Sequence, residues 1–212
     1  SCTINQTDKT IPDVRLLIRT SMTQLVLTFF GTFQAVVNDR PVTAFRSDKV
    51  RCLLAYLALE ADQPHNRESL AGFLWPDQPQ ATAQNNLRVS LSRLRAALGD
   101  QAAVPAWLTI THRTLGFNPA SKHWIDVAQF LQLIEATQQH RHERLDRCAS
   151  CIAQLQQATA LYRGEFLHGI LIEGSDLLDA WVRHKRQSLQ RLAVDALFHI
   201  SRYYSEQADF AH

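Results

Sequence analysis

Cysteine is scarce in this sequence, and long apolar runs are missing. Four cysteines in 212 residues are too few for a disulfide-stabilised fold. No stretch approaches the roughly 18 uncharged apolar residues that a membrane helix needs, which excludes an integral membrane protein. The first ten residues are polar and lack the apolar core of a secretory signal. We therefore expect the protein to work in the reducing cytoplasm, without contact to a membrane.

Glycine is also rare, with seven in the whole chain. The sequence contains no glycine-rich phosphate loop and no GxSxG or HExxH motif, which argues against a nucleotide site and against the common hydrolases. Its nine histidines are scattered, and none pairs convincingly with a carboxylate and a nucleophile. We expect neither enzyme activity nor a cofactor.

A Cys148-x-x-Cys151 pair, with His140 and His142 nearby, raises the alternatives of a zinc site and a redox motif. A structural zinc site usually has four ligands in two such halves, and the sequence has no second pair. A thioredoxin-like motif would follow a strand, whereas this pair begins a predicted helix. We therefore favour two thiols on a helix and predict no metal site.

Charge of either sign is in small excess only, because the formal net charge is +2. This excludes a histone-like polycation but leaves room for a local basic face. Residues 1–120 carry 12 Lys and Arg against 9 Asp and Glu, and residues 121–212 carry 10 against 11. Any basic patch is therefore expected in the first half.

Shifts in composition divide the chain into three parts. Residues 1–22 end at the only methionine and are expected to be a tail, with a short strand at 14–18 as the alternative. Residues 23–120 mix strand and helix signals, whereas residues 124–212 are helical, which places a domain boundary near Ser121. The chain stops inside a helical pattern, which favours a longer parent protein.

Both strands and helices are expected in the first half. Residues 25–37 are rich in β-branched and aromatic residues, Asn38-Asp39 supplies a turn, and residues 41–45 fit a returning strand. Residues 107–117 predict a hairpin with a polar tip. Helical spacing, with Ser47 or Asp48 as a possible first cap, predicts six helices over about 49–60, 67–74, 81–98, 126–138, 149–164 and 177–204.

The helix over 81–98 has two different faces. Four leucines spaced four, three and four apart form an apolar stripe that must pack on a core: Leu87, Leu91, Leu94 and Leu98. No Asp or Glu occurs between Asp77 and Asp100. The other sides carry amides, hydroxyls and arginines, the residue types that read base edges and phosphates, although a solvated face is the alternative. The candidate DNA-binding residues of this helix are Thr82, Asn85, Asn86, Arg88, Val89, Ser92 and Arg93.

The elements around this helix fit a winged helix-turn-helix. Two short helices precede it and a hairpin follows, so the third helix would enter the groove. The hairpin tip can reach a neighbouring minor groove or phosphates through His112, Arg113 and Thr114. Other cations at the ends of elements are candidate phosphate contacts, with an ordinary surface charge as the alternative for each: Arg46, Lys49, Arg51 and Arg67.

Five segments in one order and register carry a resemblance to a known family: LTFFGTFQAVVNDRPVTAF, KVRCLLAYLAL, RESLAGFLWPD, NNLRVSLSRLRAALGD and LYRGEFLHG. Together they resemble the antibiotic-regulatory-protein (SARP) type of bacterial transcriptional activator. This resemblance, from about Leu25 to the end, implies an α+β OmpR-type winged helix-turn-helix over 23–120. It implies part of an all-α, tetratricopeptide-like bacterial transcriptional activation domain over 124–212.

The resemblance also implies a function and partners. Such proteins bind double-stranded promoter DNA at direct repeats, often as side-by-side homodimers, and recruit RNA polymerase. By position, the recognition helix would include Asn86, Arg88, Ser92 and Arg93, and the wing would include Arg113. Residues at positions that look structural are Trp75, Pro76, Leu91 and Leu94. The alternative function is a protein-interaction scaffold, which pairing of Arg88 and Arg93 with carboxylates would favour.

Overall fold

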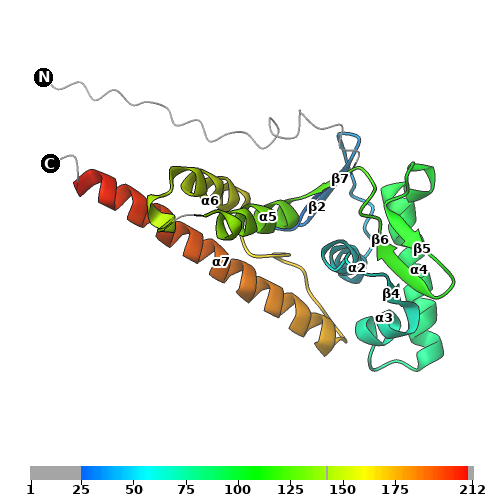
Figure 1. The fold of residues 1–212 in the computed structure, drawn as a ribbon. Helices are drawn as coiled ribbons and strands as arrows, with labels where there is room; N and C mark the ends of the chain where they lie inside the picture. The colour runs from blue at the N-terminus through cyan, green and yellow to red at the C-terminus, as the bar shows by residue number, and fades with distance from the viewer. Residues whose placement is uncertain (1–24, 142, 210–212) are drawn as a thin grey trace, which may run out of the picture.

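The computed structural model describes residues 25–141 and 143–209, and Figure 1 shows their arrangement. The expected tail over 1–22, its alternative strand and His142 lie outside these residues. A four-stranded sheet stands at the centre, with a three-helix unit and a small second sheet on one side and the three helices of the second half on the other. None of the described helices is both long and apolar enough to cross a membrane.

The central sheet has the strand order β3-β2-β1-β7. Strands β1 (Leu25–Thr28) and β2 (Gln34–Val37) are antiparallel, and β2 pairs with β3 (Arg40–Pro41). Asn38 and Asp39 form the tight turn with φ of 47° and 62°, a conformation that Asn and Asp tolerate better than most residues.

The returning strand predicted over 41–45 is shorter than expected. Strand β3 ends at Pro41, and the last ladder contact is the hydrogen bond that Val42 N donates to Ala35 O at 2.8 Å. The chain then turns so that Phe45 packs edge-on against Phe33, with ring centroids 5.0 Å apart. Burial of this ring takes the place of further strand pairing.

The prediction of helix from Trp124 onward is wrong at its start. Residues His123–Ile125 form strand β7, which lies parallel to β1 with Val26 opposite Trp124. Three residues are too few to show a strand pattern in the sequence. The strand forms because the edge of β1 offers backbone partners that β2 does not use.

Three helices form the unit beside this sheet. They are α2 (Asp48–Leu59), α3 (Arg67–Leu74) and α4 (Gln80–Leu98). Asn66 caps α3 by accepting hydrogen bonds from Glu68 N at 2.8 Å and Ser69 N at 3.2 Å. At the predicted cap of α2, the Ser47 side chain makes no capping hydrogen bond. Gly99 ends α4 in the left-handed conformation.

The second sheet has the order β4-β6-β5 and contains the predicted hairpin. Strands β5 (Leu108–Ile110) and β6 (Thr114–Phe117) are antiparallel, and β4 (His65–Asn66) adds a short third strand. A short 3-10 turn, η1 (Asp100–Ala102), follows α4. Because β4 leads into α3 and pairs with the hairpin, and η1 connects α4 to the hairpin, the hairpin lies next to both the start and the end of the helix-turn-helix.

The second half of the chain is helical apart from β7 and its connections, the longest of which is the irregular segment over 162–175. It contains α5 (Asp126–Gln139), the 3-10 turn η2 (Leu145–Arg147), α6 (Ala149–Leu161) and α7 (Asp176–Asp209). These agree with the three helices predicted there, except that α6 ends three residues earlier and α7 ends five residues later than predicted. In Figure 1, α5 and α6 lie together and the long α7 runs beside them.

The two halves share one core. The segment before α7 runs along the end of β1: Leu167 N donates to Phe29 O at 2.8 Å and Gly31 N donates to Glu165 O at 3.0 Å. The buried rings of Phe29 and Phe166 contact edge-to-face, with centroids 6.1 Å apart. The boundary near Ser121 is therefore a change of secondary structure inside a continuous hydrophobic core.

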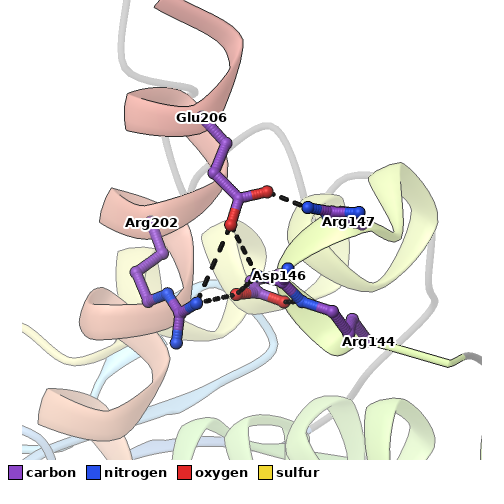
Figure 2. Close-up of polar contacts among 5 residues, drawn as sticks. All are labelled: Arg144, Asp146, Arg147, Arg202 and Glu206. Atoms are coloured by element: carbon purple, nitrogen blue, oxygen red, sulfur yellow. Dashed lines mark hydrogen bonds and ion pairs between the residues drawn. The ribbon is translucent and has the colours of Figure 1, made fainter. Parts of the chain in front are cut away.

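Ion pairs join η2 to the end of α7 (Figure 2). The buried Asp146 accepts a hydrogen bond from Arg144 Nη2 at 2.7 Å, and Arg202 Nη2 lies 3.0 Å from its Oδ2 atom. Glu206 pairs with Arg144 and accepts from Arg147 Nε at 3.0 Å. The hydrogen bond from Arg144 lowers the pKa of Asp146 to about 2. The connection between α5 and α6 is thereby anchored to α7.

Candidate nucleic-acid interface

Helices α3 and α4 form the helix-turn-helix. The turn spans residues 75–79, where Trp75 ends α3 and Pro76 and Pro79 prevent a continuous helix. Trp75 N still donates to Ala71 O at 2.9 Å, so the last turn of α3 is complete. Trp75 and Pro76 therefore shape the turn, in the structural role expected for them.

One side of α4 anchors it to the core. The four leucines of the predicted stripe are all buried, at 1, 6, 0 and 2 % exposure: Leu87, Leu91, Leu94 and Leu98. Ala83 and Ser90 are buried on the same side. Because these contacts fix the rotation of the helix, they also decide which residues face outward.

The other side of α4 carries the candidate base-reading residues. The structure leaves Thr82, Asn85, Arg88, Ser92 and Arg93 exposed, and Asn86 and Val89 are half-buried at the edge of this face. We call these seven residues the recognition face. All seven lie on one helix, and none is buried in the core.

Neither arginine of the recognition face is paired with a carboxylate among the described residues. Arg88 Nη2 donates to Asn85 Oδ1 at 3.0 Å, one helical turn away. Over residues 25–141 and 143–209, no carboxylate lies within ion-pair distance of Arg88 or Arg93. Both guanidinium groups can therefore meet an anionic partner without first breaking an ion pair.

A third arginine of α4 has a structural role instead. Arg95 Nε lies 3.4 Å from Asp100 Oδ2, and the carboxylate of Asp100 is buried. Asp100 Oδ1 accepts from Trp107 N at 2.9 Å and from Leu108 N at 3.1 Å, at the start of the hairpin. Asp100 thus fixes the hairpin to the end of α4. Sequence reasoning missed this residue, although it is the first acid after the acid-free stretch.

The hairpin tip is a tight, polar turn. Thr111 Oγ1 accepts from Thr114 N at 2.8 Å and from Arg113 N at 3.2 Å, which closes the turn. His112 and Arg113 are exposed, and Thr114 is half-buried with its hydroxyl 2.8 Å from Thr111 Oγ1. Of the three predicted wing residues, His112 and Arg113 have exposed side chains, and Thr114 shapes the turn.

Arg67 connects the tip to α3. Its backbone N donates to Arg113 O at 2.9 Å, and its Nη1 donates to Thr111 O at 3.2 Å. The residue as a whole is half-buried, and its guanidinium group retains donors for a further contact. Arg67 therefore braces the wing.

Two of the predicted phosphate contacts hold the fold together instead. Lys49 Nζ donates to Leu74 O at 3.0 Å and to Gly174 O at 3.2 Å, and burial lowers the pKa of Lys49 from its usual value. Arg51 pairs with Asp48 and donates to Phe45 O. Two of the three ammonium hydrogens of Lys49 and both terminal nitrogens of Arg51 are used in these contacts. Arg46, by contrast, is exposed.

The helical half of the chain packs on the side of the three-helix unit away from α4. Ser175 Oγ donates to Phe73 O at 2.6 Å, and Glu60 accepts from Trp181 Nε1 at 2.9 Å and pairs with Lys185 at 2.8 Å. These contacts involve α2 and α3. Figure 1 shows α4 at the right edge of the molecule, with α2 between it and α7. The recognition face is therefore not covered by α5–α7.

Comparison with family models gives one match for each half of the chain. Residues 45–118 match the family described as transcriptional regulatory protein, C terminal, and residues 125–207 match the bacterial transcriptional activator domain. The first match contains α2, α3, α4 and the hairpin, and the second contains α5, α6 and most of α7. The comparison with curated protein sequences gave no match.

A solved structure shares the fold. It is that of Mycobacterium tuberculosis EmbR in complex with a low-affinity phosphopeptide, with a TM-score of 0.61 and 22% sequence identity. The match covers 82% of the present chain and 44% of that protein, so the present chain spans less than half of its length. The chain therefore combines a transcriptional-regulator winged helix with a bacterial transcriptional activator domain, which is the arrangement that its resemblance to SARP-type activators implies.

Proposed function

We propose that this protein recognises specific sequences in double-stranded promoter DNA by placing α4 in the major groove. The observation that carries the proposal is the recognition face, which is exposed, free of acidic residues and fixed in rotation by the buried leucine stripe. Its 19 residues give α4 a length of about 28 Å, enough to lie along the groove. The DNA-binding role of the family supports this assignment.

Within the recognition face, Arg88 and Arg93 are the proposed readers of guanine. Arginine can donate two hydrogen bonds to the O6 and N7 atoms of this base. Asn85 and Asn86 offer the amide pair that suits adenine, and the Val89 side chain suits the methyl group of thymine. Thr82 and Ser92 carry hydroxyl groups suited to bases or phosphates.

The wing and the nearby cations supply the contacts to the DNA backbone. His112 and Arg113 project from the hairpin tip, where a neighbouring minor groove or phosphate would lie. Arg46 and the brace residue Arg67 complete the proposed set. Lys49 and Arg51 are left out, because their side chains are engaged with Leu74, Gly174, Phe45 and Asp48.

The second half would act through protein contacts in the cytoplasm. The family resemblance supports binding at direct repeats, as a side-by-side homodimer, with recruitment of RNA polymerase through residues 124–212. The exposed surfaces of α5–α7 are free for such contacts, because their inner faces pack on the sheet and on α2 and α3. In this scheme residues 23–120 select the promoter sequence, and residues 124–212 make the contacts that recruit RNA polymerase.

The proposal is tested by measuring affinity for a duplex selected from random DNA by the wild-type protein. Arg88→Ala and Arg93→Ala are each expected to weaken binding by about 5- to 150-fold, the loss of one good base contact. Arg191→Ala, which removes an exposed arginine from α7, is the matched control and should leave affinity unchanged.

Two results would contradict DNA recognition by α4. One is equal affinity of the Arg88, Arg93 and Arg191 variants for the selected duplex. The other is failure of the wild-type protein to bind DNA or heparin even at low salt, because phosphate contacts strengthen as salt is lowered. The second result would favour a scaffold whose winged helix binds protein.

A further inference from the structure

Two thiols and an imidazole meet between α5 and α6. His140 Nδ1 lies 3.5 Å from Cys148 Sγ and 3.3 Å from Cys151 Sγ. All three potential ligand atoms lie within 4.8 Å of one another. His140 ends α5, Cys148 immediately precedes α6, and Cys151 lies buried in its first turn. The sequence analysis noted His140 near the two cysteines but favoured two thiols on a helix and predicted no metal site.

We propose that His140, Cys148 and Cys151 bind a Zn²⁺ ion, with the fourth position of the ion open to water or another external ligand. Thiolate and imidazole are the ligands that zinc prefers in proteins, and a set of two cysteines and one histidine is known for sites that keep an open position. Residues from two helices converge here, so the ion would join the end of α5 to the start of α6.

The distances agree with tetrahedral coordination. A zinc ion lies about 2.3 Å from sulfur and about 2.0–2.1 Å from nitrogen. At a tetrahedral angle these bond lengths place a nitrogen and a sulfur ligand about 3.6 Å apart. The two nitrogen–sulfur distances of 3.5 and 3.3 Å are close to this value. Small side-chain movements would therefore suffice to admit the ion.

The surroundings favour a thiolate-bound cation. Ser150 Oγ lies 3.2 Å from Cys148 Sγ and can donate to the sulfur, as groups around metal ligands commonly do. Arg144 and Arg147, which follow His140 in the chain, are paired with Asp146 and Glu206, so carboxylates offset their charge (Figure 2).

An entry path also exists beside the cluster. A surface hollow lined by Glu143, Arg144, Arg147 and Cys148 opens next to the outer sulfur. Cys148 is partly exposed, whereas Cys151 is 1 % exposed. An ion arriving through the hollow would meet Cys148 first and would keep its open position toward solvent.

A disulfide between Cys148 and Cys151 is the competing use of the same sulfurs. It would need an oxidant and would leave His140 without a role, although this imidazole is close to both sulfur atoms. The convergence of three ligand types on one point favours the metal. Figure 1 shows the α5–α6 pair far from α4, so metal binding is expected to stabilise the activator half and leave base recognition unchanged.

Titration of the tag-free, reduced 212-residue protein with Co²⁺ tests the site, because Co²⁺ replaces Zn²⁺ and is coloured. We expect uptake of one ion per chain, with the sulfur-to-cobalt charge-transfer band and the visible bands of tetrahedral cobalt. Zn²⁺ should then displace the cobalt. His140→Ala, Cys148→Ser and Cys151→Ser should each lower the affinity by more than about 100-fold.

Two variants serve as controls and should bind Co²⁺ as the wild type does. They are His168→Ala, which removes an exposed histidine, and Cys52→Ala, which removes a thiol buried in the core. His140 is exposed at a helix end, so its variant keeps the test valid even where a cysteine variant fails to fold. Absent uptake, undiminished uptake by His140→Ala, or a Cys148–Cys151 disulfide formed in place of metal binding would overturn the site.

Discussion

At the scale of single residues, buried carboxylates position the elements of this fold. Asp126 is 3 % exposed and accepts hydrogen bonds from Phe29 N and Phe30 N, each at 2.9 Å, and from Val127 N at 2.7 Å. It therefore joins the end of β1 to the start of α5. Asp100 makes the corresponding link between α4 and the hairpin. Neither linking role could be predicted from the sequence, because a single acidic residue does not indicate which distant backbone groups its carboxylate will bind.

The pKa of Asp126 predicts a pH dependence of stability. Burial raises this pKa from 3.8 to about 6, against the opposing effect of the backbone donors and Arg163. The folded protein therefore holds a proton between about pH 4 and 6 that the unfolded chain has released. The stabilisation that this proton provides is present below about pH 4 and is lost as the pH rises through 6, by about 3 kcal/mol in total.

Urea unfolding of the wild type and of Asp126→Asn, which does not titrate, measures this effect. The wild type should lose about 3 kcal/mol relative to the variant between pH 4 and 7. Asp195→Asn, at an exposed position on α7, should show no such change and serves as the control. A stability difference that stays constant, or that moves in favour of the wild type at pH 7, would disprove the assignment.

At the scale of elements, local patterns predicted the helices and the hairpin well. The leucine stripe, the Trp75-Pro76 stop and Gly99 located α3 and α4 to within a residue, because their signals lie in the elements themselves. Strand β7 was missed because three residues carry no period and pair with a strand 98 positions away. Likewise, the role of Lys49 depends on Gly174, which no local pattern connects to it.

Two glycines in this helical unit should respond to alanine in opposite directions. Gly99 has a φ of 68°, where a side chain is strained, and Gly72 lies within α3 with no atom within 4 Å of an added Cβ. Gly99→Ala should destabilise the protein by about 1 kcal/mol. Gly72→Ala should stabilise it by about 0.5–1 kcal/mol, because alanine favours helix.

Chemical unfolding of the two variants beside the wild type measures both effects. The account predicts that the midpoint falls for Gly99→Ala and rises for Gly72→Ala. Shifts of the same sign would show that backbone conformation at Gly72 and Gly99 does not determine the effect of these substitutions on stability.

At the scale of the whole molecule, the two halves depend on each other. The first sheet includes β7, which comes from the beginning of the second half. Asp126 accepts a hydrogen bond from Phe29 N just after β1, and the segment around Phe166 lies along the same end of this strand. Arg186 on α7 secures that segment by donating to Phe166 O and Leu167 O, both at 2.9 Å. The sequence predicted two successive domains, and it could not reveal this exchange because the contacts connect residues far apart in the chain.

A fragment of residues 25–120 should therefore be much less stable than the full chain. It lacks β7, Asp126 and the Phe166 segment, which leaves the edge of β1 and the rings of Phe29 and Phe30 exposed. Thermal unfolding followed by circular dichroism should give one cooperative transition for the full chain and a markedly lower midpoint, or aggregation, for the fragment. Equal midpoints would show that the winged helix is independent.

The central claim is that α4 reads bases from the major groove, and methylation interference on a selected duplex tests it most directly. Methylation of guanine N7 blocks the major-groove edge of that base. The account predicts that methylation at particular guanines prevents binding by the wild type. It also predicts that Arg88→Ala or Arg93→Ala removes this sensitivity at one of them, while Arg191→Ala retains the full pattern. Binding unaffected by N7 methylation, or an identical pattern for all four proteins, would contradict it.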